Sequence, residues 1–514
     1  MDGVETTEIS SWGPFGRPLF DDPATRHLSR VGVVDIGSNS VRLVIFDGAA
    51  RSPAYFFNEK VLCGLGAGLT ETGRLNPKGR ERALAALERF QALSAGFGVA
   101  PLTAVATAAM RNAEDGAEFQ EEIARRTGIK AFIIDGPDEA RLSAQGVLLG
   151  WPSATGVVCD IGGSSLELAA LDQGRVGACE TAALGPLKLQ DTKRGKGALR
   201  KHIDGEMAPF CAGFAGAARR LFLVGGSWRA IAKLDMARRN YPLKVLHEYR
   251  MPPNNLRRTL KWIANTDIAT MRQLTGIGAE RMGLIPTAAL VLDSVLKHLR
   301  PKEVYVSSYG LREGLLWEQM PDDLRERDPL IEACRFAEAK DARVPGFGKV
   351  LYNFVKPLFP RFPKSRLRVV KAACLLHDVT WRAHPDYRAE VCFDYATRAN
   401  LGGLSHGERI FLGLALLHRY KNSRAERLDR VLELVEEPLQ REAEILGKAM
   451  RFGAMFSAQR SDQMGRLKWH PGRKLLVLQI GPESKPLYSE VAQARFASLV
   501  KALDADSDVT ELPE

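Results

Sequence analysis

The feature that most constrains the fold of this chain is an internal repeat of one short segment. Val33–Leu43 (VVDIGSNSVRL) recurs as Val158–Leu168 (VCDIGGSSLEL), with Asp, Ile, Gly, Ser and the final Leu at matching places. Each copy predicts a buried strand that ends in an aspartate, then a tight turn of small residues and a second strand. A single turn of this kind is typical of an ordinary β-hairpin, but a matched pair indicates two related α/β units.

The turns of both copies have the composition of an anion-binding loop. Glycine and serine allow backbone N–H groups to point into a concave nest, and the hydroxyls add further donors. Asp35 and Asp160, at the strand ends, are of the type that holds Mg²⁺ directly or through water. Two such hairpins facing each other would hold one phosphate chain from both sides. The predicted phosphate-binding residues are Gly37, Ser38, Asn39, Ser40, Gly162, Gly163, Ser164 and Ser165.

From about residue 31 to 320, short β-branched segments alternate with longer helical ones. This alternation predicts an α/β fold in which helices cover the sheets. The predicted strands are Val31–Ile36, Leu43–Phe46, Thr103–Thr107, Ala131–Asp135, Val157–Ile161, Leu221–Val224 and Glu303–Ser307. The predicted helices are 78–96, 115–127, 138–149 and 280–299.

The C-terminal part of the chain has a different pattern. Residues 328–440 show helical periodicity and few strand signals, which predicts an all-helical domain. The last segment predicts a small α/β unit, with a hairpin around His470–Arg473, a strand Lys474–Ile480 and a helix Ser489–Leu503. The acidic tail Asp504–Glu514 is expected to fray.

Composition limits the partners and the compartment. The 514 residues exceed one ordinary domain, and this length favours roughly three or four. The net charge of +11 favours anionic partners, although charge alone does not choose among polyphosphate, nucleic acid and acidic lipid. The cysteines are scattered, without a C-x-x-C pair, which is typical of a reduced compartment. We see no secretory signal and no uncharged apolar run of about 18 residues, so we expect a cytoplasmic protein with no membrane partner.

Six segments in the first part of the chain resemble, in order, those of the Ppx/GppA family of exopolyphosphatases and guanosine pentaphosphate phosphatases, in the actin/Hsp70/sugar-kinase superfamily. They are Val34–Leu43, Ala104–Arg111, Ile133–Leu142, Val158–Leu168, Leu223–Ile231 and Val306–Leu316. The resemblance implies an α/β fold of two ribonuclease-H-like (actin-like) lobes around a cleft, followed by an all-helical HD-like domain and a small C-terminal α/β domain. The expected parts are a leader 1–30, lobe I 31–140 with a returning helix 309–320, lobe II 141–308, the HD-like domain 321–440 and the last domain 441–514.

The same resemblance implies attack of water on a terminal phosphorus. Glu139 matches the carboxylate base, and Arg111, at the end of the expected strand segment Thr107–Arg111, should hold the charge that develops on the transferred phosphoryl group. Asp160 and Glu167 are the expected ligands of Mg²⁺. The residues alone also allow simpler explanations, since acids are favoured at helix N-termini and Arg111 and Glu167 could face solvent.

The second phosphate loop of this chain differs from the family's usual sequence. The family's second loop usually reads D-I-G-G-G-[ST], whereas this chain has Ser164 at the third glycine. A Cβ disfavours positive φ, so the fit of the phosphate and the chain-length preference are in question, though not the reaction class.

Gly225-Gly226-Ser227 lies where nucleotide-using relatives in the superfamily bind adenosine. In this family the segment does not imply ATP, and a turn that opens a helix also explains it.

His377-Asp378 resembles the motif of HD-type metal phosphohydrolases. Those enzymes also need an upstream histidine, and residues 331–358 contain none, so we expect a degenerate HD-like fold without its metal. Two basic runs would attract a long polyanion unless they are simply solvated faces: Lys193, Arg194, Lys196, Arg200 and Lys201, and Arg361, Lys364, Arg366, Arg368 and Lys371. No RNA-recognition aromatic motif accompanies them, so no specific nucleic acid is expected.

The leading hypothesis is therefore a Mg²⁺-dependent exopolyphosphatase that releases orthophosphate processively from inorganic polyphosphate. The nearest alternative is hydrolysis of pppGpp to ppGpp at the same site, but the extra C-terminal domains and the basic runs favour the polymer. A kinase of the superfamily would need an acceptor pocket, for which we find no signature. The non-enzymatic alternative is a polyanion or alarmone sensor without turnover. Family analogy also implies a homodimer.

Overall fold

The computed structural model describes residues 30–99, 102–192, 194–423 and 428–512. The chain divides into two compact units, Met1–Arg327 and Asp328–Glu514. The first unit holds both copies of the repeat, and the second is mainly helical. Except for Arg30, the predicted leader 1–30 lies outside the described residues.

The first unit contains two sheets that share one strand order. The first sheet runs β3-β2-β1-β4-β5, and the second runs β10-β11-β9-β6-β7-β8. In each sheet, the two strands of the repeated hairpin and the strand that follows them along the chain pair in antiparallel fashion. The first strand of each hairpin also pairs in parallel with a strand on its other side, β1 with β4 and β6 with β9. The predicted strands are confirmed, whereas β3, β8 and β10 were not predicted. The bounds are β1 Val31–Ile36, β2 Ser40–Phe46, β3 Tyr55–Leu62, β4 Thr103–Ala106, β5 Lys130–Ile133, β6 Gly156–Ile161, β7 Leu166–Asp172, β8 Arg175–Ala182, β9 Arg220–Gly225, β10 Tyr249–Arg250 and β11 Glu303–Val306.

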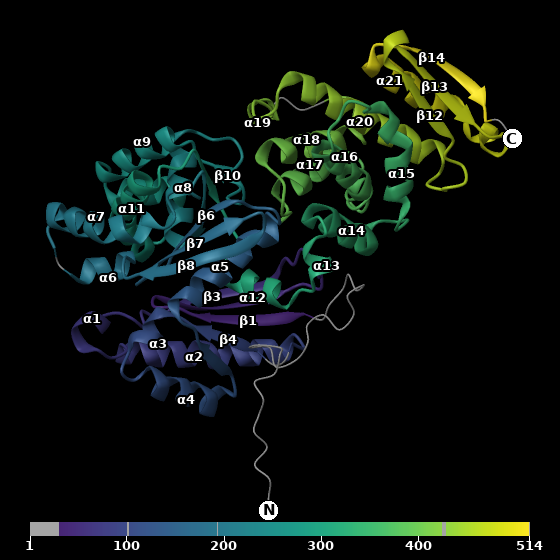
Figure 1. Cartoon of the computed structure of the whole chain (residues 1–514). Coiled ribbons are helices and arrows are strands. Elements are labelled where there is room, and N and C mark those ends of the chain that lie inside the picture. The colour runs from purple at the N-terminus through teal and green to yellow at the C-terminus, as the bar shows by residue number, and fades with distance from the viewer. Residues whose placement is uncertain (1–29, 100–101, 193, 424–427, 513–514) are drawn as a thin grey trace, which may run out of the picture. The chain divides into compact units, whose positions relative to one another are not determined.

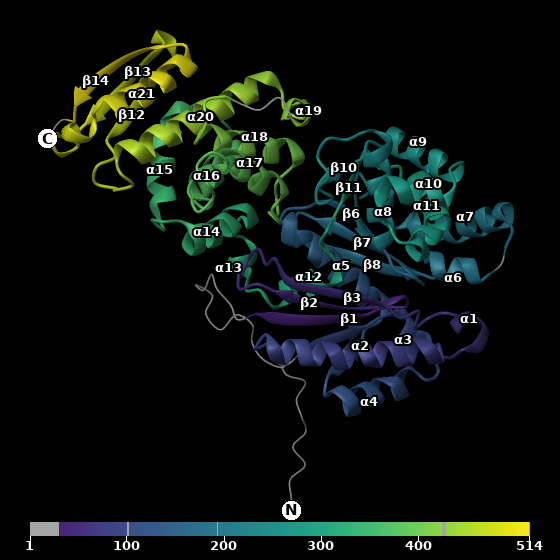
Figure 2. The same ribbon diagram turned by 180° about the vertical axis from the view of Figure 1, so that it is seen from behind.

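Two helices, α5 (Gly136–Gly150) and α12 (Leu311–Gln319), pack between the sheets, as Figure 1 and Figure 2 show from opposite sides. Because successive side chains on a strand point to opposite faces, Val33 joins this inner core and Val34 joins an outer core. The outer core of the first sheet is completed by the helices α2 and α4. This burial on both faces explains why β1 and β6 are almost wholly apolar up to their final Asp-Ile.

α5 and α12 approach each other so closely that glycine is required at their crossing. A Cβ on Gly314 of α12 would overlap the carbonyl of Leu142, and a Cβ on Gly146 of α5 would overlap the carbonyl of Gly310. The helix expected at 309–320 is therefore present as α12, and it packs against α5 backbone to backbone.

The helices α6 to α11 contribute to the outer core of the second sheet. Among the described residues, α11 is the one helix long and apolar enough to cross a membrane, which is weak evidence because buried core helices pass the same test, and α11 packs in the core of the second sheet. The bounds are α1 Leu69–Thr72, α2 Pro77–Gly96, α3 Ala108–Asn112, α4 Gly116–Thr127, α6 Pro186–Asp191, α7 Lys196–Ala212, α8 Gly226–Arg238, α9 Pro253–Ala264, α10 Ile268–Thr275, α11 Ala279–Leu299 and α13 Asp322–Arg325.

The second unit contains a helical part and a small sheet of order β12-β13-β14. The predicted hairpin, strand and helix near the C-terminus are confirmed as β12, β13 and α21. The bounds are α14 Pro329–Asp341, α15 Phe347–Val355, η2 Lys356–Leu358, α16 Lys364–Leu376, α17 Arg388–Arg398, α18 His406–His418, α19 Asp429–Leu432, α20 Glu437–Phe456, β12 Arg466–His470, η4 Pro471–Arg473, β13 Leu475–Ile480, η5 Pro482–Leu487, α21 Glu490–Leu503 and β14 Asp506–Glu511.

Three expectations about boundaries and order are corrected. The tail expected to fray contains β14, which pairs in parallel with β13 along its whole length. The expected limit at 440/441 falls inside α20, and that at 140/141 falls inside α5, so neither helix is divided between two parts. For the tail, pairing with β13 outweighs the acidic composition that suggested fraying.

Candidate phosphate-binding and catalytic site

The two repeated hairpins form the same turn. The Gly37 N–H donates to the Ser40 carbonyl at 3.0 Å, and the Gly162 N–H donates to the Ser165 carbonyl at the same distance. Within the described part of the chain, the backbone N–H groups of the two central residues of each turn have no acceptor. These groups are Ser38 and Asn39 in one turn, and Gly163 and Ser164 in the other. Such unpaired donors at the tip of a turn are what a bound oxyanion requires.

The two turns lie against each other at one cavity of about 530 Å³. A Cβ built on Gly163 would stand 3.3 Å from Cβ of Ser38, so the two turns are in contact. All of the predicted phosphate-binding residues line the cavity except Ser164. Ser164 is also absent from the described non-glycine residues with positive φ, so its side chain causes no backbone strain. The Gly-to-Ser departure from the family's loop is therefore tolerated by the backbone of this turn.

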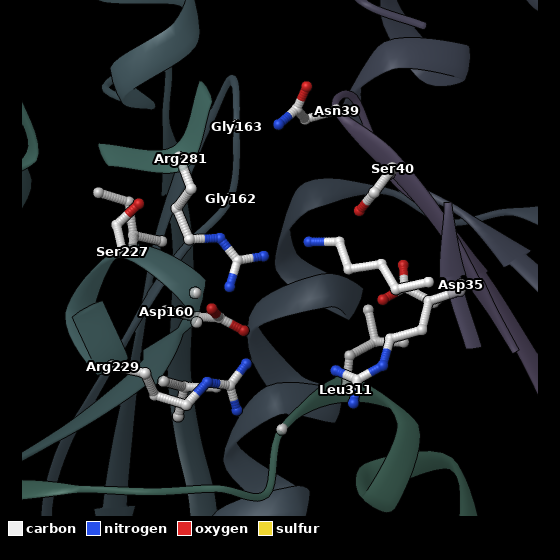
Figure 3. Close-up of a pocket in the computed structure, with 18 of the residues that line it drawn as sticks. Asp35, Asn39, Ser40, Asp160, Gly162, Gly163, Ser227, Arg229, Arg281 and Leu311 are labelled. Atoms are coloured by element: carbon white, nitrogen blue, oxygen red, sulfur yellow. The ribbon is translucent and has the colours of Figure 1, made fainter. Parts of the chain in front are cut away.

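The aspartates at the ends of β1 and β6 line the cavity from opposite sides, as Figure 3 shows. Asp35 accepts a hydrogen bond from Nη1 of Arg312 at 2.7 Å. Asp160 accepts one from the Ser143 hydroxyl, and burial raises its pKa. Gly225, with φ of 108°, would place a Cβ 2.8 Å from Oδ1 of Asp160, so glycine at this position leaves room for the carboxylate.

Glu139 lies in the first turn of α5 and lines the same cavity. The Asp135 side chain caps this helix, and the acidic first turn suits the positive end of the helix dipole. Burial, together with the charges of Asp160 and Asp35, raises the pKa of Glu139 to about 8 against the opposing effect of Arg111. A buried carboxyl group that titrates near neutral pH, beside two phosphate-type loops, is suited to accept a proton from water.

Arg111 lies on the short helix α3, which corrects the expectation that it ends a strand segment. Its Nη1 donates to the Ile134 carbonyl at 2.8 Å and to Oε2 of Glu139 at 3.2 Å. Among the described residues that line the cavity, Arg111 is not included. Arg111 was predicted to hold charge on the transferred phosphoryl group, and the structure places it against the Glu139 carboxylate rather than among the described residues of the cavity wall.

Glu167 stands on β7 directly opposite Asp160 of β6. Its side chain is 1% exposed, does not line the cavity within the described residues, and accepts a hydrogen bond from the Thr181 hydroxyl at 3.2 Å. Burial raises its pKa well above the usual range, and Glu139 and Asp160 add to this effect. Burial therefore favours the uncharged form of Glu167, which lies beside Asp160 but is not among the described residues that line the cavity.

The cavity is lined by more cations than the sequence predicted. Burial lowers the pKa of Lys60 to about 8, with help from the charges of Arg281 and Arg42, and burial lowers that of Arg281 beside Arg229. Figure 3 shows Arg229 and Arg281 on either side of Asp160. Crowded cations of this kind are favourable only when an anion lies among them. The cations that line the cavity are Arg42, Lys60, Arg229, Lys233, Arg281 and Arg312.

Three of these residues lie in segments that the sequence analysis identified. Arg42 belongs to the internal repeat, and Arg229 and Arg312 belong to segments that resemble the family. Lys60 and Arg281 carried no such signal. Lys60 comes from the unpredicted strand β3, and Arg281 comes from the first turn of α11, far along the chain. Only the packing of the two sheets brings them to the same cavity.

The residues fit a divalent metal that is bound together with phosphate. Among the described residues, no cluster of three or more His, Cys, Asp or Glu side chains could enclose a metal ion. Mg²⁺ commonly binds through one or two carboxylates, with phosphate oxygens and waters as its other ligands. Asp160 is a carboxylate of this kind, because it faces the cavity and is hydrogen-bonded by a neutral hydroxyl.

Comparison with known proteins decides the family. The Ppx/GppA phosphatase family matches residues 44–323, which include β6, β7, α5 and most of both sheets. The chain belongs to the Ppx/GppA phosphatase family. It is therefore a phosphatase, and the same segments that suggested this family in the sequence carry the cavity in the structure. A second match, to the C-terminal region of exopolyphosphatases, covers residues 361–504.

Three individual relatives of this chain carry different names. Exopolyphosphatase 1 of Mycobacterium tuberculosis is 26% identical over 317 residues, covering 59% of this chain and 92% of that protein. The guanosine-5'-triphosphate,3'-diphosphate pyrophosphatase of Aeromonas hydrophila is 25% identical over 363 residues, covering 67% and 72%. Retrograde regulation protein 2 of Saccharomyces cerevisiae is 25% identical over 481 residues, covering 82% and 78%.

Solved structures of the Ppx/GppA family share the fold of the first unit. An exopolyphosphatase from Cytophaga hutchinsonii superposes with a TM-score of 0.52 at 23% identity, covering 57% of this chain and 98% of that one. The Aquifex aeolicus family member gives a TM-score of 0.50 at 23% identity, covering 56% and 97%. These likenesses concern the fold alone.

In the HD-like motif of this Ppx/GppA chain, Asp378 is ion-paired with Arg343, whereas Nε2 of His377 is buried without a hydrogen-bond partner among the described residues. Asp378 is fully buried and accepts hydrogen bonds from Nε and Nη2 of Arg343 at 2.9 and 2.6 Å. His377 is also fully buried, and its Nδ1 lies 2.8 Å from the Cys374 carbonyl. Burial lowers the pKa of His377 to about 3, and the charge of Arg419 adds to this, so the imidazole is neutral.

The two basic runs are partly neutralised. Arg368 donates to Asp328, Arg366 lies 4.0 Å from Glu442, and Arg200 forms an ion pair with Asp293. Lys193 lies outside the described residues. Such side chains are less available to a polyanion than the sequence suggested, so the cations inside the cavity are the stronger anion-binding feature.

Proposed function

We propose that this chain is a Mg²⁺-dependent exopolyphosphatase that removes the terminal phosphate of inorganic polyphosphate. The observation that carries this proposal is the cavity itself, where two matched turns with unpaired N–H groups meet a cluster of cations and Glu139. This arrangement supplies several phosphate contacts and one base, as hydrolysis of a polyanion requires. The named exopolyphosphatases among the relatives support the same substrate.

We also propose that the first unit consists of two ribonuclease-H-like lobes, as in actin, around a cleft that contains this cavity. The identical strand order of β3-β2-β1-β4-β5 and its counterpart β8-β7-β6-β9-β11 supports the proposal. Residues from both sheets line the cavity, and α12 returns from the second sheet to pack against α5.

In the proposed reaction, the unpaired amides of the two turns and the cations Arg229 and Arg281 hold the terminal phosphate. Glu139 takes a proton from the attacking water as the oxygen–phosphorus bond forms. The bond from phosphorus to the bridging oxygen breaks, orthophosphate is released, and the polymer is one phosphate shorter. Arg111 keeps Glu139 in position through its 3.2 Å contact and favours the ionised carboxylate.

Asp160 is the residue that would hold the metal, with the phosphate oxygens as further ligands. A bound Mg²⁺ would supply positive charge against the phosphate oxygens. It would also stabilise ionised Glu139, because Asp160 is among the charges that raise the pKa of that base. Glu167, which lies behind the cavity, would act only through these two carboxyl groups.

A second function, hydrolysis of pppGpp to ppGpp, is favoured by one feature of the cavity. The apolar side chains that line the cavity include Leu246, Ile277 and Leu284. An apolar wall next to phosphate-binding groups suits a nucleoside that carries a polyphosphate. The Aeromonas relatives, which are named for this chemistry, support it as the alternative.

The test is orthophosphate release by the purified full chain with Mg²⁺, from long-chain polyphosphate and from pppGpp. Rapid release from the polymer without intermediate lengths on a gel is the expected result, and it would establish a processive exopolyphosphatase. Release from pppGpp alone would assign the chain to the alarmone branch. Tight binding of either ligand without release would contradict both reactions and indicate a sensor.

A further inference from the structure

The two aspartates of the repeat have different nearest partners, although they occupy equivalent positions. Asp35 is ion-paired with Arg312 at 2.7 Å, and the Arg312 residue is only 8% exposed. Asp160 receives a hydrogen bond from the neutral hydroxyl of Ser143, and among the described residues no cation lies within ion-pair distance of it. One loop carboxylate is thus in a direct ion pair and the other is not, although the charges of Arg229 and Arg312 also act on Asp160.

Hydrogen bonds to Glu313, the next residue along α12, hold the first turn of the helix that carries Arg312. Glu313 accepts a hydrogen bond from the Gly310 N–H at 2.8 Å and another from the Tyr55 hydroxyl of β3 at 2.5 Å. Burial lowers the pKa of Arg312, but Tyr55, Glu313 and Asp35 raise it by more, so the guanidinium stays charged. The first turn of α12 therefore presents a fixed cation to the end of β1.

We propose that Arg312 is a positioning residue that neutralises Asp35 and so leaves Asp160 as the one loop aspartate open to the metal. The proposal rests on the proposed phosphatase site. It explains why two nearly identical hairpins form a site in which the two aspartates have different roles. An ionised and unpaired Asp35 would compete for the metal. It would also oppose the ionisation of Glu139, since Asp35 already raises the pKa of that base.

Metal binding without turnover tests the first part. The full chain is titrated with Mn²⁺ in the presence of imidodiphosphate, a non-hydrolysable analogue of pyrophosphate, and bound Mn²⁺ is followed by electron paramagnetic resonance. Asp160→Asn should weaken Mn²⁺ binding about 10- to 100-fold, whereas Asp35→Asn should change it less than about twofold. Arg312→Met should tighten it about tenfold, because it frees a second carboxylate. Equal weakening by the two aspartate variants, or no bound Mn²⁺ in the unaltered chain, would overturn the proposal.

A double-mutant cycle tests the second part. Arg312→Met should move the acidic limb of the kcat/KM profile to higher pH, and adding Asp35→Asn should move it back. Arg312→Lys retains the charge and should keep the original limb, which also controls for a folding defect. If Arg312 instead bound the substrate, KM would rise and Asp35→Asn would restore nothing. The Mn²⁺ measurement needs no hydrolysis, so it remains decisive even if the proposed substrate is wrong.

Discussion

Two motifs in this chain contain an aspartate of the kind that binds metals in phosphohydrolases, and the structure treats them differently. In the first unit, Asp160 faces a cavity and is bonded by one hydroxyl. In the second unit, Asp378 is fully buried and both of its oxygens accept hydrogen bonds from Arg343. Its neighbour His377 is buried in the neutral form.

The comparison teaches that a motif indicates chemistry only if its polar atoms remain available. A guanidinium that bonds both oxygens of a carboxylate occupies the positions that a metal would need. The cavity of the first unit has the opposite property, since its cations outnumber its acids and its turn amides are unpaired. We therefore expect substitutions in the first unit to change turnover, and those in the HD-like motif to change stability.

The largest effect should come from Glu139→Gln. Loss of the base should lower kcat about 10²- to 10⁴-fold while binding of polyphosphate is retained. Orthophosphate release and a separate binding assay measure the two quantities. Asp138→Asn is the matched control, because this residue lies in the same helical turn but its side chain is 48% exposed and pairs with Arg141. A variant that loses binding and keeps its turnover would refute the assignment of the base.

The next effect should come from the unpredicted cations. Lys60→Met and Arg281→Met should each raise KM about 10- to 100-fold, because a hydrogen bond to a charged group contributes about 1.5–3 kcal/mol. Steady-state kinetics with polyphosphate of defined length measure the change. Lys130→Met, on the exposed side of β5, is the control for loss of a charge. If Lys60→Met and Lys130→Met behaved alike, the cavity would not be the binding site.

A smaller effect concerns pH. The pKa of Glu139 is raised to about 8, and the base acts only when it is ionised, so kcat/KM should rise as the pH increases towards that value. Bound Mg²⁺ should move the acidic limb of the kcat/KM profile to lower pH, because its charge stabilises the ionised carboxylate of Glu139. The pH profiles of kcat/KM at low and saturating Mg²⁺ measure this shift. If the acidic limb persisted in Glu139→Gln, it would report the titration of a group other than Glu139.

The smallest effect on turnover should come from the HD-like motif. Asp378→Asn should leave kcat within about twofold but lower the free energy of unfolding by about 1–3 kcal/mol, because it weakens a buried charged contact with Arg343. Urea denaturation followed by circular dichroism measures the stability. Loss of turnover without loss of stability would show that the second unit takes part in the chemistry, and the contrast between the two motifs would fail.

The sequence predicted those parts of the molecule that depend on local pattern. β1 was placed to the residue, because its two buried faces require an unbroken apolar strand. The segment around Arg111 was assigned to a strand, yet its alanine-rich residues continue from β4 into the helix α3. The acidic β14 has little intrinsic strand preference and forms by pairing with β13.

The residues of the candidate site were likewise predictable where they lie in a local sequence pattern, and not where tertiary packing brings them to the cavity. Glu139 and the turn residues lie in short matching segments, so the sequence identified them. Lys60 and Arg281 reach the cavity only through the packing of β3 and α11, which no local pattern reveals. Arg312 was part of a matching segment, but its ion pair with Asp35 depends on the position of α12 between the sheets.

The crossing of α5 and α12 has a consequence for the interpretation of natural variants. Gly146 and Gly314 are not among the described residues that line the cavity and carry no side chain, yet the smallest possible replacement at either would collide with a backbone carbonyl of the other helix or its N-cap. An alanine there would look conservative by any comparison of residue types. We expect it to separate the helix that carries Glu139 from the helix that carries Arg312, so a harmless-looking change would damage the enzyme as severely as the loss of a reactive group.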